Sequence, residues 1–197
     1  MDLTSITPEP HQLRALAHPV RLRMLGMLRI DGPATATSLA TRLGLNSGAT
    51  SYHLRQLAQH GFVVDDEERG NGRERWWKAA HTSTRTAGGP AGTEAGDSAD
   101  AFLQAAVVVY AEWLQQAVEE GPLLPEPWRD ATSFNDWIHR ITPTQAVRLR
   151  RSIGELMEAL EDDDDPDARA VVVQVHVFPR PGQEYDTTPG ADLADPP

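Results

Sequence analysis

The stretch TSLATRLGLNSGATSYHLRQLAQH, residues 37–60, decides the fold because it predicts two short helices joined by a tight turn. Residues 37–43 carry apolar side chains at helical spacing and stop at Gly44. Residues 47–60 repeat the helical pattern and stop at Gly61. A helix, a glycine-containing turn and a second helix form the helix-turn-helix layout, whose second helix enters the major groove of DNA.

The second of these helices has two chemically different sides. Thr50, Leu54 and Leu57 lie at i, i+4 and i+7 and are expected to face the core. On the opposite side, Arg55 is suited to guanine or phosphate, while Ser51 and Tyr52 are suited to phosphate oxygens. From this helix alone, an ordinary amphipathic helix with a solvated face remains the alternative. The predicted DNA-binding residues on the polar side are Ser47, Gly48, Ser51, Tyr52, Arg55 and Gln59.

A predicted hairpin follows the second helix directly. Residues 62–64 (FVV) begin a strand, residues 69–73 (RGNGR) form a turn, and residues 75–78 (RWWK) form the returning strand. Trp76 and Trp77 point to opposite faces, so one of them is expected in the core. In this position the hairpin is a wing whose arginines lie over a neighbouring minor groove or backbone, with a charged solvent loop as the alternative. The predicted DNA-binding residues of the wing are Arg69, Asn71, Arg73 and Arg75.

These residues also carry a family resemblance. The sequence from His18-Pro19-Val20-Arg21 through LATRLGLNSGATSYHLRQLAQHGFV to GRERWW resembles the ArsR-type winged-helix transcriptional regulators, in the branch with a C-terminal extension. The likeness covers residues 10–80, and residues 141–179 resemble that extension more weakly. It implies a symmetric homodimer on a partly palindromic operator, with half-sites about one helical turn apart.

Metal sensing does not carry over from that family. Many ArsR relatives bind metals through cysteines before the recognition helix or through His/Asp pairs in the dimer helix. This chain has no cysteine, and residues 101–119 hold no histidine. We therefore predict no metal and no cofactor, and any effector stays unknown.

The charge is divided unevenly along the chain. The net charge is −11, yet residues 1–81 hold ten Lys/Arg against eight Asp/Glu, and residues 82–197 hold eight against twenty-one. Such an asymmetry points to a polyanionic partner for the first part only. An acidic second part suits a basic partner, which keeps a winged helix used for protein–protein assembly open as the main alternative.

Composition divides the chain into four parts and predicts an α+β, mainly α fold. Residues 10–81 are the winged helix-turn-helix and residues 82–99, rich in Gly and Ser/Thr, are a flexible linker. Residues 100–180 are a helix–strand–helix–strand unit for dimerisation or sensing, with strands at 133–141 and 171–178. Residues 181–197 are an acidic, disordered tail.

The helix predicted at 101–119 has a wide apolar side that a small winged-helix unit would leave uncovered. We therefore expect it to form the dimer interface, with a ligand pocket in the C-terminal unit as a weaker alternative. The predicted dimerisation residues are Phe102, Ala106, Val109 and Trp113.

Enzymatic and membrane functions find no support in the sequence. No nucleophile–base–carboxylate pattern or phosphate-binding loop appears, and no run of about 18 apolar residues is present. The absence of cysteine fits a reducing compartment, so a cytoplasmic protein is expected. The sequence thus predicts a sequence-specific transcription regulator of double-stranded DNA, a repressor rather than an activator, and not an enzyme.

Overall fold

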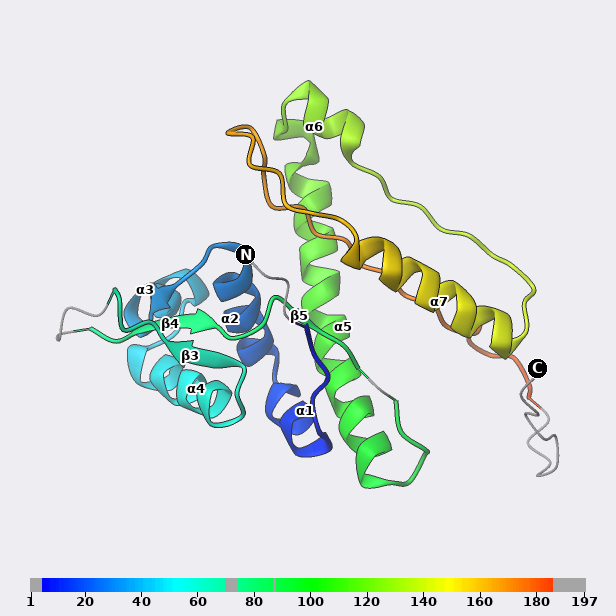
Figure 1. The fold of residues 1–197 in the computed structure, drawn as a ribbon, viewed down its shortest axis with the longest axis horizontal. Coiled ribbons are helices and arrows are strands. Elements are labelled where there is room, and N and C mark those ends of the chain that lie inside the picture. The colour runs from blue at the N-terminus through cyan, green and yellow to red at the C-terminus, as the bar shows by residue number, and fades with distance from the viewer. Residues whose placement is uncertain (1–4, 70–73, 87, 186–197) are drawn as a thin grey trace. The chain divides into compact units, whose positions relative to one another are not determined.

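The computed structural model describes residues 5–69, 74–86 and 88–185 and divides into two units, one ending at Asp136 and the other beginning at Trp137. The first unit holds two small sheets and most of the helices (Figure 1). Its elements are β1 (Ser5–Ile6), α1 (Pro10–Leu16), α2 (Pro19–Ile30), β2 (Ala34–Thr35), α3 (Ala36–Leu43), α4 (Ser47–Gln59), β3 (Val63–Asp65), β4 (Trp76–Ala79), β5 (Ser83–Thr84), α5 (Glu94–Glu120), the 3₁₀ turn η1 (Gly121–Leu123) and α6 (Glu126–Ala131). The second unit holds α7 (Pro143–Glu158).

The predicted helix-turn-helix is confirmed as α3 and α4. The Thr35 side chain accepts a hydrogen bond from the Ser38 amide at 3.2 Å and starts α3. Gly44 ends α3 with a left-handed φ of 64°, a conformation that glycine adopts without strain. Asn46, rather than Ser47, caps α4, since its Oδ1 accepts from the Ala49 amide at 2.8 Å.

The predicted wing is confirmed as an antiparallel pair, β3 and β4, with β2 on the other edge of β4. Val63 pairs with Ala79, and Ala34 pairs with Trp77. Trp77 is the tryptophan that enters the core, being 4% exposed, while Trp76 on the other face is half-buried. The sheet thereby fastens the base of the wing to the start of α3.

One core joins α1, α2, α3, α4 and the sheet. Leu16, Met24, Leu39, Leu54 and Phe62 are each almost fully buried in it. Such burial stabilises by about 1.5–3 kcal/mol for each large apolar side chain. The predicted class, α+β and mainly helical with an N-terminal winged helix-turn-helix, is therefore confirmed.

Helix α5 belongs to this core and buries part of its apolar side within the same chain. Phe102, Ala106 and Val109 are 5%, 1% and 1% exposed, and α5 packs against α1 and α2 of the same chain. The half-buried Trp113 lies over Gly26 of α2. The side of α5 that carries Phe102, Ala106 and Val109 thus packs within one chain, because α1 and α2 supply an apolar surface for it, and a dimerisation role for these residues and Trp113 stays a prediction.

The predicted linker, residues 82–99, is also shorter than expected. Ser83–Thr84 form β5, which pairs in parallel with β1, and Arg29 of α2 holds this segment. The Arg29 Nε donates to the His81 carbonyl at 2.9 Å and its Nη2 donates to Thr84 Oγ1 at 2.8 Å, and burial lowers the pKa of Arg29 to about 10. Helix α5 then begins at Glu94, capped by the Thr93 hydroxyl. Backbone pairing thus orders part of a segment whose composition is typical of linkers.

The predicted strands at 133–141 and 171–178 are not formed. Both segments lie outside any helix or strand, and within the described residues neither pairs with a neighbour. Alternation of side chains reports which face a residue would occupy, but a strand exists only where its backbone finds a partner. Between the two segments, α7 begins with a capping box, in which Thr142 and Gln145 exchange hydrogen bonds. The predicted tail, 181–197, lies largely outside the described residues.

Candidate nucleic-acid interface

Helix α4 presents the expected polar side outward. Thr50, Leu54 and Leu57 are fully buried, so the orientation predicted from their spacing is confirmed. Of the six residues predicted to bind DNA on this helix, Ser51 is half-buried and five are exposed: Ser47, Gly48, Tyr52, Arg55 and Gln59. Small side chains occupy the first turn, which lets the backbone of α4 approach a ligand closely.

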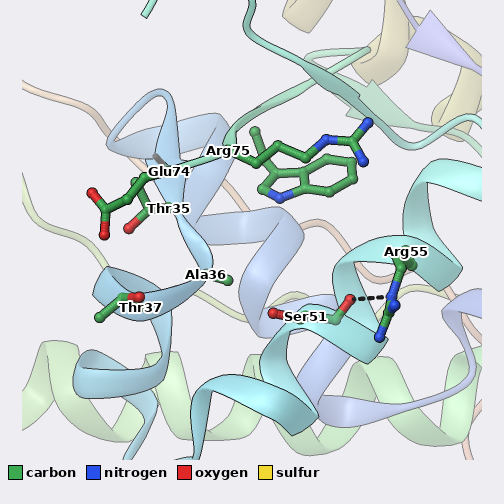
Figure 2. A pocket seen from close by; sticks show the side chains of 8 residues that line it. Thr35, Ala36, Thr37, Ser51, Arg55, Glu74 and Arg75 are labelled. Atoms are coloured by element: carbon green, nitrogen blue, oxygen red, sulfur yellow. Dashed lines mark hydrogen bonds between the residues drawn. The ribbon is translucent and has the colours of Figure 1, made fainter. Parts of the chain in front are cut away.

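A pocket of about 340 Å³ lies beside this face, between the start of α3, the middle of α4 and the base of the wing (Figure 2). Ser51 and Arg55 reach it from α4, and the Arg55 Nε donates to the Ser51 carbonyl at 3.2 Å. Thr37 adds a hydroxyl from the first turn of α3, while Glu74 and Arg75 close the wing side. Hydroxyls and guanidinium groups from three elements converge there, a donor set suited to a phosphate.

The described wing arginines are held at its base. The Arg75 Nε lies 2.6 Å from Asp65 Oδ2, and its guanidinium lies 4.2 Å from the centre of the Trp77 ring. Arg69 lies 3.6 Å from Asp66 and over Trp76 at 5.9 Å. Both arginine side chains are more than half exposed, so their charges remain available to a ligand in spite of these ion pairs.

Asp66 is a buried carboxylate at the base of the β3–β4 hairpin. Its side chain is 5% exposed and lies 3.2 Å from the Lys78 Nζ as well as 3.6 Å from the Arg69 Nε. Two cations thus compensate one buried carboxylate at the foot of the hairpin. The other two predicted wing residues, Asn71 and Arg73, lie outside the described residues.

Comparison with known proteins bears on this same region. The family described as "Helix-turn-helix domain" matches residues 16–65. Over 54 residues the chain is 46% identical to the HTH-type transcriptional regulator NmtR of Mycobacterium tuberculosis, a match that covers 27% of this chain and 44% of that relative. Residues 16–65 are a helix-turn-helix domain of the ArsR type. The chain thus matches less than half the length of that regulator.

A solved structure, the YusO protein of Bacillus subtilis, shares 13% sequence identity with the chain. The superposition covers 76% of this chain and 82% of that one with a TM-score of 0.32.

Sequence reasoning missed some residues that face this interface. Thr35 and Thr37 line the pocket from the strand and first turn beside the wing, because α3 begins one residue earlier than predicted. The cap pattern at Thr35 is the signal that would have found them. On the other flank of α4 in the ArsR-type domain, His18 and Arg21 of α2 approach His53, a contact between residues more than thirty positions apart for which the sequence gives no periodic signal.

Among the described residues no helix is both long enough and apolar enough to cross a membrane.

Proposed function

We propose that the protein is a transcription regulator that binds double-stranded DNA through its ArsR-type domain. The observation that carries the proposal is the convergence of Ser51, Arg55 and Arg75 on one pocket beside an exposed, polar recognition helix. Helix α4 would lie in the major groove, with Arg55 reading a base edge or a phosphate. The wing and the first turn of α3 would hold the phosphates of the adjoining backbone. The protein would act in the cytoplasm, where it meets its DNA.

We also propose that the protein binds as a homodimer through a different face of α5 from the one that the sequence suggested. Leu103, Val107, Leu114 and Val118 form an exposed apolar stripe at spacings of four, seven and four residues, and their exposed fractions lie between 43% and 62%. A stripe with this spacing faces one direction along a helix and suits a second helix packed alongside it. Two copies related by a two-fold axis would place two recognition helices about 34–36 Å apart on a partly palindromic operator.

Repression is the mode of regulation that this arrangement supports. A dimer that occupies two successive major grooves of a promoter excludes polymerase from the same DNA, and exclusion requires no contact with the transcription machinery.

The test is DNA binding by the full chain and by single-residue variants. Selection from genomic fragments at low salt identifies a bound sequence, and fluorescence anisotropy then measures its affinity. Arg55→Ala should weaken binding by about 1–3 kcal/mol, or about 5- to 150-fold, and relax preference at the base pair that it reads. Arg75→Ala should weaken all sequences alike and reduce the slope of log K against log salt by about 0.9.

Arg148→Ala, an exposed position on α7 in the second unit, is the matched control and should leave both quantities unchanged. Failure of the wild-type chain to retain any duplex at low salt would overturn the proposal. Binding of both variants with wild-type affinity and salt slope would remove the pocket from the interface.

A further inference from the structure

A cluster of imidazole rings and one guanidinium lies on the flank of α4 away from the wing pocket. His18 caps α2 and its ring centroid is 4.7 Å from that of His53 on α4. Tyr52 lies beside His53 at 5.5 Å between centroids. Arg21, one turn into α2, is close enough to influence the charge states of both His18 and His53. His60 and His11 extend the cluster along α4 and α1, with centroids 5.7 Å apart.

The charged groups that act on the histidines of this cluster are arginines and other histidines. Burial lowers the pKa of His53, and His18 and Arg21 lower it further. Burial also lowers the pKa of His18 and that of His60, and the charged neighbours that add to this are Arg21 and Arg23 for His18, and His11 and Arg21 for His60. Arg21 acts on all three of these histidines and carries a permanent positive charge, so an anion would be attracted to the place where they meet.

Two polar atoms in the cluster lack a hydrogen-bond partner in the described structure. These are the Nε of Arg21 and the Nδ1 of His53, and both atoms are shielded from solvent. Buried polar atoms are nearly always paired, so each unpaired one calls for a specific explanation such as a bound ligand. Phosphate oxygens would accept from the Arg21 Nε and, when His53 carries a proton on Nδ1, from that atom as well.

The cluster lies where the second strand of a bound duplex would pass. Ser51 and Arg55 border the wing pocket on one flank of α4, while Tyr52 and His53 lie progressively further round the helix toward α2. A helix in the major groove has one sugar–phosphate backbone on each side. The wing pocket would take one backbone, which leaves the other beside His18, Arg21 and His53.

We propose that His18, Arg21 and His53 bind a backbone phosphate of DNA, and that His53 takes up a proton as the phosphate binds. The inference rests on the proposed DNA-binding function and adds a second phosphate site with a pH-dependent affinity. It assigns a binding role to α2, which the helix-turn-helix layout alone does not.

The two histidines have different parts in this site. His18 Nδ1 accepts a hydrogen bond from the Val20 amide at 3.2 Å, so the neutral ring carries its proton on Nε2 and can donate only from there. Protonation of His18 on Nδ1 would break this cap. The Nδ1 of His53 has no such partner in the described structure, so a proton on this atom can be donated to a phosphate.

The sign of the pH dependence follows from the charges. In the free protein the lowered pKa keeps His53 neutral near pH 7. A phosphate brings a negative charge that raises the pKa of His53, so binding and protonation favour each other. Affinity for DNA should then increase as the pH falls, by at most about tenfold per pH unit for one linked proton, between the pKa of the bound and that of the free form.

The experiment measures the affinity of the full chain for a fluorescein-labelled 30-bp duplex from pH 8 to pH 6 at constant low ionic strength, with EDTA present. The wild type should bind several-fold more tightly at pH 6 than at pH 8. His53→Gln should bind with comparable affinity at pH 8 and show little change toward pH 6. His139→Gln, an exposed histidine of the second unit, is the matched control and should keep the wild-type pH dependence.

A direct measurement covers the case in which His53→Gln does not fold. The pKa of His53, followed by proton NMR with and without the duplex, should be higher in the complex. Arg21→Gln should independently reduce the slope of log K against log salt by about 0.9. An unchanged pH dependence in His53→Gln, or a His53 pKa that DNA does not raise, would overturn the second phosphate site while leaving the DNA-binding function intact. Failure of the wild type to bind any duplex at either pH would overturn both.

Discussion

Replacing Gly26 with alanine tests whether α5 is part of the winged-helix core. A Cβ at position 26 would lie 2.9 Å from the Trp113 Cζ2 and 3.1 Å from its Cη2. The indole ring is rigid, so it must shift as a whole by several tenths of an ångström. Inserting a methyl group into a packed core costs about 1–3 kcal/mol. Replacing glycine by alanine inside a helix, on the other hand, stabilises the fold by roughly 0.5–1 kcal/mol.

Gly26→Ala should therefore lower the free energy of unfolding by an amount between zero and about 2.5 kcal/mol. Urea unfolding followed by circular dichroism at fixed protein concentration measures it. The matched control is the same substitution in a Trp113→Leu background, where the clash is relieved and alanine should stabilise by roughly 0.5–1 kcal/mol. The two backgrounds should differ by about 1 kcal/mol or more. Equal stabilisation by alanine in both would refute the packing of Trp113 on α2.

Three further substitutions examine the core, the wing and the contact between α2 and α5. Leu54→Ala empties a fully buried site and should lower the free energy of unfolding by about 2–5 kcal/mol, measured by urea titration. Asp66→Ala leaves Lys78 without its buried partner at the foot of the wing and should cost about 1–3 kcal/mol, seen as a lower thermal midpoint. The hydrogen bond from Arg23 lowers the pKa of Glu112, so the ion pair stabilises the fold above the unfolded-state pKa and this contribution is lost as the pH falls through the folded-state pKa. Glu112→Gln should thus be less stable than the wild type by up to about 0.5 kcal/mol at pH 7, and the difference should vanish once the pH is below the folded-state pKa of Glu112.

The helix-turn-helix was predictable because its determinants are local. Gly44 must take a left-handed conformation, and the apolar spacing of Leu54 and Leu57 defines the inner side of α4 within three turns. The outward position of Arg55 then follows from helical geometry alone. Cap residues were less certain, since Asn46 and Ser47 are both good N-cap residues and only the backbone decides between them.

The sequence was a poorer guide wherever a segment needs a partner distant in the chain. Residues 171–178 have the composition of a strand, yet no strand of the described chain lies beside them. Residues 83–84 have the composition of a linker, yet they pair with β1. The cluster around His53 depends in the same way on α2 lying against α4, which no spacing within either helix reveals.

Helix α5 was predicted correctly as a helix, but the sequence did not show which of its apolar sides packs in the core. The sequence gives it apolar residues around much of its circumference, and one wide apolar side is hard to distinguish from two neighbouring ones. Phe102 and Val109 face α1 and α2, whereas Val107 and Leu114 point away from that core. Changing Val107 and Leu114 to glutamate should therefore abolish the proposed dimerisation, measured by sedimentation equilibrium, without unfolding the winged helix, whereas Val109→Glu should unfold it. A double variant that stays dimeric at the wild-type concentration range would show that a different surface joins the two copies.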